Sequence, residues 1–443
     1  SDAQTLASGM FHGLALGEES EAMPAVALAW NVGGMGVHWT AATPWPEGDE
    51  VFDFGDHAQW DADLATARDL LGVVRAGIGP TEPGQIVLDV LHRRYETVSD
   101  PGREPQPMPM AVDPSPLGRI RRTGPSVIFP PLGTGDDAEF TLLPRTLVTS
   151  LIVDEGVTRG AVVRDVDTGA EREILANVVV VCADAVRTPQ LLFASGLGSD
   201  AVGRYLNEHA FITGRVLMDL DRFGLSLEAL PRVREAEFAT DSLWLPQNGA
   251  GQPFHGQIMN TVFVDDDDHA LAYSVGVSLY VPVESRRENR LSFSSTETDL
   301  FGLPRVRFQF DYSDADRALI GRAVEEMTDI ASEFGELDPA TELAILPPGS
   351  SLHLTGTVRS GPVDDGTSVC DPEGRIWGVD NLFVAGTGVI PTPLACNATL
   401  TGTITAVRAA RAISTLLSAP TSQENHEDHD ARHLPHPAAA TVD

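Results

Sequence analysis

The stretch LFVAGTGVIPTPLACNATLTGTITAVRAARAI, residues 382–413, combines the signals of a buried strand, a glycine turn and a long helix. Its first four residues form an apolar run of strand length, and Gly386 and Gly388 permit the backbone angles of a tight turn. Asn397 and Thr399 are residue types that accept hydrogen bonds from the first turn of a helix. The loop is therefore expected where an open α/β sheet binds its ligand, although an ordinary strand-to-helix connection would explain the same pattern.

Other segments support a mixed α/β chain. The run VVVVCA, residues 178–183, precedes AVRTPQLLFASGL and has the pattern of a fully buried parallel strand that leads into a helix. Further helices are predicted at 62–78, at 83–98 and at 314–335, the last with an aspartate cap. Alternating strand patterns lie around 148–166 and between residues 274 and 313.

The composition restricts the classes of partner. The chain of 443 residues carries a net charge of −34 at pH 7, and such an acidic protein repels nucleic acids and anionic membranes. Three scattered cysteines do not form a disulfide framework and fit a reducing compartment, so a cytoplasmic location is expected. No apolar run reaches the length of a membrane span. The tail at 419–443 contains four histidines, and we interpret it as a flexible, solvated tail without a metal site.

One histidine precedes the first stretch along the chain. His353 lies between two apolar residues of a strand-like segment, LHLTGTVRSG at 352–361. A single histidine in such a place is more often a core residue than a functional one. Together with the NLFVAGTGVIPT loop and with Asn397 before a helix, however, this segment resembles the carboxyl-terminal signature of the glucose-methanol-choline (GMC) oxidoreductases, and NVGGMGVHWTAATP at 31–44 is similar to the pyranose oxidase branch.

The resemblance implies the fold and the division into domains. A Rossmann-like FAD-binding domain, formed by 1–45, 140–210 and 350–418, is expected to interleave with a substrate-binding domain, formed by 46–139 and 211–349 and built on a largely antiparallel sheet with helices. The amino-terminal GxGxxG segment that usually binds the ADP half of FAD is absent from the sequence, so truncation upstream or a second piece is expected to account for it.

The resemblance also implies the roles of individual residues. His353 corresponds to the catalytic base and Asn397 to its hydrogen-bonding partner, and both would touch the substrate. Gln257 and Met259, in and after FHGQI, are placed in the substrate site, whereas His255 has a simpler interpretation as a strand-edge residue. The residues expected to contact FAD are Gly33, Gly34, Gly36, His38, Trp39, Thr40, Ala183, Gly386, Gly388, Asn397 and Thr399, with a covalent bond through His38 left open.

Three positions depart from the family pattern. Asp184 stands where a glycine is usual, close to the expected cofactor, and Met259 and Asn260 replace the more polar, basic residues of the oxidases that attack carbon 2. The resemblance therefore implies an FAD-dependent oxidase of a pyranose or glycoside at a secondary hydroxyl, at carbon 2 or, as we favour, carbon 3, with oxygen or a quinone as acceptor. The alternatives are oxidation of a non-sugar alcohol and a non-catalytic sugar-binding relative.

Overall fold

The computed structural model describes residues 10–12, 21–114, 120–134, 137, 139–231, 239–339, 341 and 343–418. The histidine-rich tail and its predicted lack of a metal site lie outside these residues. Among the described residues, none of the helices combines the length and the apolar run needed to cross a bilayer.

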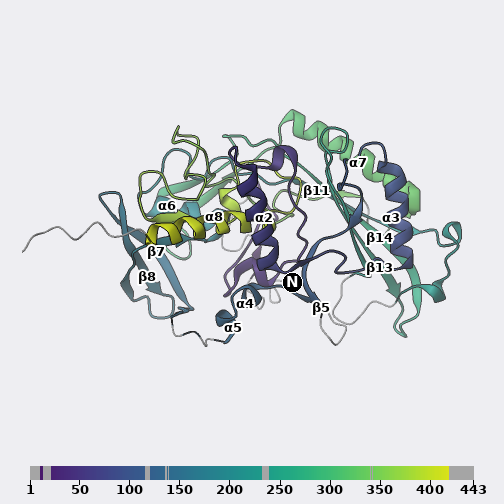
Figure 1. Cartoon of the computed structure of the whole chain (residues 1–443), viewed down its shortest axis with the longest axis horizontal. Helices are drawn as coiled ribbons and strands as arrows, with labels where there is room; N and C mark the ends of the chain where they lie inside the picture. The colour runs from purple at the N-terminus through teal and green to yellow at the C-terminus, as the bar shows by residue number, and fades with distance from the viewer. Residues whose placement is uncertain are drawn as a thin grey trace, which may run out of the picture.

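The largest sheet is antiparallel and has seven strands. Their order is β17-β11-β14-β13-β12-β4, and β18 also pairs with β11. α3 and α7 cover one face of this sheet, where their apolar side chains form its main core (Figure 1). The strands are β4 (Gln106–Pro107), β11 (Ala210–Met218), β12 (Asp241–Leu245), β13 (His255–Val264), β14 (Ala270–Val281), β17 (Gly335–Leu337) and β18 (Ala344–Ile345).

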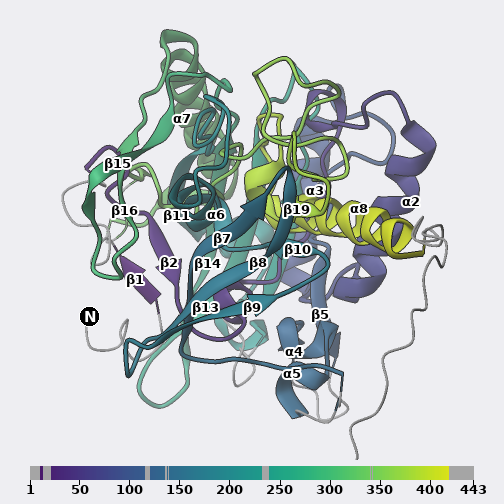
Figure 2. The same ribbon diagram turned by 90° about the vertical axis from the view of Figure 1, so that its left-hand side faces the viewer.

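A second group of elements surrounds a parallel pair of strands, β10 (Val179–Val181) and β19 (Leu382–Val384). The three-stranded antiparallel sheet of β7 (Thr146–Asp154), β8 (Val157–Asp165) and β9 (Glu171–Leu175) lies beside this pair (Figure 2). The predicted full burial of the 178–183 strand is wrong, because Val180 is 43% exposed. Within the described residues β10 pairs only with β19.

The helices lie where they were predicted, but several of their ends differ. The helix expected at 62–78 begins at His57, and the helix expected at 83–98 spans Glu82–Tyr95. The helix expected at 62–78 ends at Leu71, because Gly72 adopts a left-handed conformation with φ +63° that terminates it. The helix that begins at residue 314 is capped by Ser313, which forms a capping box with Asp316, and not by an aspartate. The helices are α2 (His57–Leu71), α3 (Glu82–Tyr95), α4 (Pro125–Ile128), α5 (Pro131–Thr134), α6 (Asp184–Ala194), α7 (Asp314–Phe334) and α8 (Ala398–Ser418).

Short elements complete the described chain. Three small antiparallel sheets are formed by β1 (Met10–His12) with β2 (Ala27–Ala29), by β3 (Val73–Val74) with β5 (Met110–Pro114) and β6 (Ile120–Arg122), and by β15 (Arg290–Thr298) with β16 (Pro304–Gln309). Single 3-10 turns are η2 (Gly34–Val37), η3 (Gly48–Glu50), η4 (Asp221–Phe223), η5 (Leu227–Ala229) and η6 (Thr387–Val389).

The predicted fold class is confirmed: a parallel strand pair with helices adjoins a largely antiparallel sheet. A shared core joins the two parts, since α2 packs against α8, and Trp244 of β12 belongs to the same cluster as Leu394 and Leu400. The loop between β19 and α8 therefore reaches the large sheet. The domain boundaries themselves stay a prediction.

Candidate active site

The face of the large sheet opposite α3 and α7 carries a set of polar side chains. On β13, Ile258 and Val262 belong to the core that the helices cover. Because neighbouring side chains of a strand point to opposite faces, His255, Gln257 and Met259 point to the other face. The same alternation places Trp244 of β12 and Tyr280 of β14 on that second face, and His209 directly precedes β11.

His353 and Asn397 approach this face from two loops. Asn397 directly precedes α8, as the 382–413 stretch predicts. The segment around His353 was expected to be strand-like, but it is a loop in which Leu352 has a left-handed φ of +60°. A single bridge between Asn207 and Thr355 connects this loop to the chain before β11.

The two predicted catalytic residues meet directly. The Nε2 atom of His353 lies 3.3 Å from Nδ2 of Asn397. On its other side, Nδ1 of His353 lies 2.8 Å from Nε2 of His209, whose Nδ1 is 3.2 Å from the carbonyl oxygen of Leu394. The loop that carries Asn397 thus contacts this series of hydrogen bonds at both ends, through the amide of Asn397 at one end and the carbonyl of Leu394 at the other.

The amide oxygen of Asn397 is also bonded. Its Oδ1 atom lies 3.1 Å from Nε2 of His255 and accepts a hydrogen bond of 2.6 Å from Nε2 of Gln257. The indole N–H of Trp244 donates to Nδ1 of His255 at 2.9 Å. Gln257, predicted as a substrate contact, is therefore in the same network, and Met259 lies two residues further along the same face.

Burial keeps the histidines of this network neutral. It lowers the pKa of His353 to about 4 and, together with the neighbouring His353, the pKa of His255 to about 3. The pKa of His209 is lowered well below its usual value by burial and then by His353. At neutral pH the three rings can therefore accept as well as donate a proton.

Two buried carboxylates hold the loops on which the network depends. Glu208 accepts a hydrogen bond of 2.6 Å from the Ser351 hydroxyl and another from the Gly349 amide, and so fixes the loop before His353. Glu50 accepts hydrogen bonds from the amides of Ala395 and Cys396 at 2.6 and 3.0 Å, directly before Asn397. Burial raises the pKa of Glu208.

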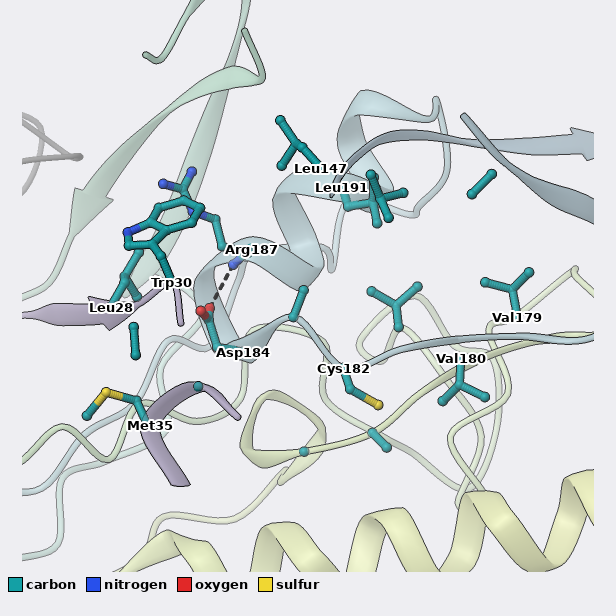
Figure 3. Close-up of a pocket in the computed structure, with 18 of the residues that line it drawn as sticks. Leu28, Trp30, Met35, Leu147, Val179, Val180, Cys182, Asp184, Arg187 and Leu191 are labelled. Carbon is teal, nitrogen blue, oxygen red and sulfur yellow. Dashed lines mark hydrogen bonds between the residues drawn. The ribbon is translucent and has the colours of Figure 1, made fainter. Parts of the chain in front are cut away.

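A cavity of about 840 Å³ lies beside β10, at the carboxyl ends of β10 and β19. Figure 3 shows part of its lining, including Trp30, Cys182 and Asp184. Four of the predicted cofactor residues also line it, namely Gly33, Gly34, Ala183 and Gly386. Gly34 and Gly386 have φ values of +54° and +110°, and a Cβ atom on either would meet no other atom within 4 Å. Backbone without side chains thus borders the open space, which suits a large ligand lying against it.

The other predicted cofactor residues do not line this cavity. Nε2 of His38 lies 3.0 Å from Oδ1 of Asn31, and the indole of Trp39 donates to the carbonyl of Thr123 at 2.8 Å. Thr40 is exposed, and Thr399 lies in the first turn of α8. Of the two remaining glycines, Gly36 faces Pro125, and Gly388 packs against Thr357 and Val358.

Asp184 shows why a glycine is usual at its position. Its φ is +62°, in the left-handed region that glycine enters without strain. The carboxylate accepts hydrogen bonds from the amides of Val186 and Arg187 at 2.6 and 2.8 Å, so it stabilises the first turn of α6 (Figure 3). The departure from the family pattern therefore supplies a helix cap at the edge of the cavity.

The sequence interpretation missed two members of the network. His255 begins β13, which pairs with strands on both sides, and the ring is only 1% exposed; it is not a strand-edge residue. His209 lies within VGRYLNEHAF, residues 202–211, and the sequence interpretation gave no role to any residue of this stretch. For His255, the two-residue spacing from Gln257 on a strand was the available signal. The described residues contain no cluster of His, Cys, Asp and Glu that could hold a metal ion.

The chain is similar to known proteins over most of its length. Two family models, both described as GMC oxidoreductase, match residues 136–211 and 285–406. A C-glycoside 3-oxidase of Microbacterium trichothecenolyticum is 38% identical over 90% of this chain and 78% of its own length, and one of Arthrobacter globiformis is 38% identical over 89% and 76%. A pyranose 2-oxidase of Tricholoma matsutake is 28% identical over 89% and 74%.

A solved structure shares the fold. Pyridoxine 4-oxidase from Mesorbium loti superposes with a TM-score of 0.62 at 17% identity, covering 89% of this chain and 87% of that one. At this identity the likeness concerns the fold alone.

Proposed function

Because this chain belongs to the GMC oxidoreductase family, we propose that it is an FAD-dependent enzyme that oxidises a secondary hydroxyl of a pyranose or glycoside to a ketone. The observation that carries the proposal is the meeting of His353 Nε2 and Asn397 Nδ2 at 3.3 Å. A base and an amide donor that converge on one point can hold one hydroxyl oxygen between them.

Side chains of this protein account for the removal of the proton from the substrate hydroxyl. Oxidation removes a hydride from carbon and a proton from the hydroxyl oxygen, and FAD, when bound, supplies the acceptor for the hydride. The neutral imidazole of His353 takes the hydroxyl proton, while the amide of Asn397 donates a hydrogen bond to the same oxygen as its negative charge develops. Gln257 and His255 keep this amide in place through its oxygen.

The cavity beside β10 supports an FAD site in this part of the chain. Its walls are mostly apolar, and the glycines at 33, 34 and 386 leave the backbone open to a flat ring system. We propose that these glycines and Ala183 contact FAD, and that Gly36, His38, Trp39, Thr40, Gly388 and Thr399 surround it. Acid precipitation of the holoenzyme tests the bond through His38: a yellow pellet that His38→Ala abolishes means covalent attachment, and a colourless pellet excludes it.

The substrate class follows from the comparisons and from one position. The two relatives named C-glycoside 3-oxidase are 38% identical, against 28% for a pyranose 2-oxidase. The partly buried thioether of Met259 points to the same face as Gln257 and offers apolar surface, which suits the aglycone of a glycoside. We therefore favour glycosides oxidised at carbon 3, with oxygen or a quinone as acceptor, in the cytoplasm.

The test compares three substrates with the purified holoenzyme under anaerobic conditions. An aryl C-glycoside should bleach the flavin band near about 450 nm faster than glucose does, and benzyl alcohol should leave it unchanged. Product analysis by NMR should show a ketone at carbon 3 of the sugar ring. A 2-keto product alone would refute the regiochemistry, and bleaching by benzyl alcohol with both sugars inert would refute the substrate class.

A further inference from the structure

A line of hydrogen bonds runs from a backbone carbonyl to the base of the proposed reaction. We propose that His209 is a positioning residue that fixes the tautomer of His353, so that the proton sits on Nδ1 and the lone pair on Nε2. This inference rests on the proposed function for its consequence, but its structural content can be measured without any turnover.

The first step of the argument is the carbonyl. The oxygen of Leu394 lies 3.2 Å from Nδ1 of His209, and a carbonyl oxygen can only accept a hydrogen bond. The proton of the neutral His209 ring is therefore on Nδ1. Its Nε2 atom is left with a lone pair and can only accept.

The second step concerns which nitrogen of His353 donates a hydrogen bond to His209. Nε2 of His209 lies 2.8 Å from Nδ1 of His353, and only His353 can be the donor in this bond. A neutral imidazole carries one N–H group, so Nε2 of His353 has the lone pair. This is the atom that faces Asn397.

A second series of hydrogen bonds, which starts at Trp244, favours the same tautomer of His353. The indole of Trp244 is a donor only, so Nδ1 of His255 accepts its hydrogen bond and Nε2 of His255 carries the proton. That proton is directed at Oδ1 of Asn397, which fixes the amide with Nδ2 toward His353. A proton on Nε2 of His353 would then place two donors 3.3 Å apart, so this second series disfavours that tautomer, and the bond from Nδ1 of His353 to His209 supplies the rest of the preference.

The surroundings make the arrangement rigid. His209 is 3% exposed, and its ring meets those of His353 and Tyr280 edge to face, with centroid distances of 4.9 and 4.8 Å. The adjacent Glu208 holds the loop of His353 through Ser351 and Gly349. Two consecutive residues thus determine both the backbone and the ring orientation of the base, as outer partners often do for functional histidines.

Two variants separate the contacts of His209. His209→Gln has an amide at the distance of Nε2, so its oxygen can still accept from His353. His209→Asn has an amide at the distance of Nδ1, so it can still donate to Leu394 but does not reach His353. The measurement is 15N NMR of the holoenzyme grown with ring-labelled histidine, with His353→Gln used to assign the His353 signals.

We expect the wild-type protein and His209→Gln to show His353 with a protonated Nδ1 and an unprotonated Nε2 at pH 7. In His209→Asn the 15N chemical shifts of Nδ1 and Nε2 of His353 should move toward each other, since both tautomers become populated. Flavin reduction should slow at least about tenfold at saturating sugar, with little change in sugar affinity.

Two results would overturn the inference: a wild-type His353 protonated on Nε2, or a His209→Asn protein with the wild-type spectrum and rate. If His209→Asn does not fold, the spectra of the wild type and His209→Gln decide. If the wild-type protein shows the expected spectrum but no sugar reduces its flavin, the proposed function is refuted and the tautomer assignment remains intact.

Discussion

Removal of the Glu50 carboxylate should both destabilise the protein and disturb the site, although Glu50 is not part of the polar network. One carboxylate oxygen accepts hydrogen bonds from the amides of Ala395 and Cys396, and the other accepts from the Glu47 amide at 3.1 Å and from the Gln247 side chain at 3.3 Å. All four contacts are from donors, so the site requires an acceptor at both oxygens.

The magnitude follows from this count. In Glu50→Gln one of the two oxygens becomes an NH₂ group, which faces two donors and loses two hydrogen bonds. Hydrogen bonds to a charged group contribute about 1.5 kcal/mol or more each, so we expect a loss of about 3 kcal/mol in the free energy of unfolding. Glu50→Ala leaves the buried amides of Ala395 and Cys396 without a partner and should cost about 3–5 kcal/mol.

The effect on the reaction comes through Asn397, which directly follows these two amides. A displacement of about 1 Å can reduce a rate by about a hundredfold, so flavin reduction in Glu50→Gln should slow by at least about tenfold, measured well below its melting temperature. Urea unfolding supplies the free energy, and anaerobic stopped-flow absorbance supplies the rate. The matched control is Asp49→Asn, an exposed acid in the same turn. A Glu50→Ala protein within about 1 kcal/mol of the wild type would refute this reasoning.

Two predictions concern pH. Since burial lowers the pKa of His353 to about 4, about nine-tenths of the base is neutral at pH 5, and the rate of flavin reduction should stay within about twofold of its value at pH 7. A fall of about 25-fold, as for an ordinary histidine pKa of about 6.5, would contradict this. The lowered pKa values of His209, His255 and His353 also mean that the unfolded chain binds more protons than the folded one below about pH 6.5. The free energy of unfolding should therefore fall as the pH drops from about 6.5 toward 4, by up to about 1.4 kcal/mol per pH unit for each histidine. The raised pKa of Glu208 acts in the opposite direction, because the folded protein then binds the extra proton. Urea unfolding at pH 7 and pH 5 measures the change, and a gain in stability on acidification would disprove it.

The sequence was most informative where residues close together in the chain also form one local structure. The strand, turn and helix between residues 382 and 413 follow from local signals, and the structure has β19 and α8 where those signals place them. The helix at 62–78 was extended too far because its apolar residues continue past Gly72 into β3. In that case one left-handed glycine outweighed the periodicity of the residues after it.

The site was harder to predict because it depends on the topology of the sheet. Nothing local shows which face of β13 lies against helices and which faces the loop of Asn397, so His255 could not be distinguished from a surface residue. His209 and His353 are 144 residues apart, and their contact depends on long-range bonds, namely the pairing of Thr355 with Asn207 and the bonds of Glu208 to Ser351 and Gly349. The exposure of Val180 likewise depends on which strands pair with β10 among the described residues.

The most direct test of the central claim is the rate at which a glycoside reduces the flavin of His353→Ala, measured by anaerobic stopped-flow absorbance at pH 7 beside the wild type. The account predicts an unchanged flavin content and a rate at least about a hundredfold lower, because the hydroxyl proton has lost its acceptor. A flavin-loaded His353→Ala protein that is reduced at the wild-type rate would contradict it and would remove His353 from the reaction.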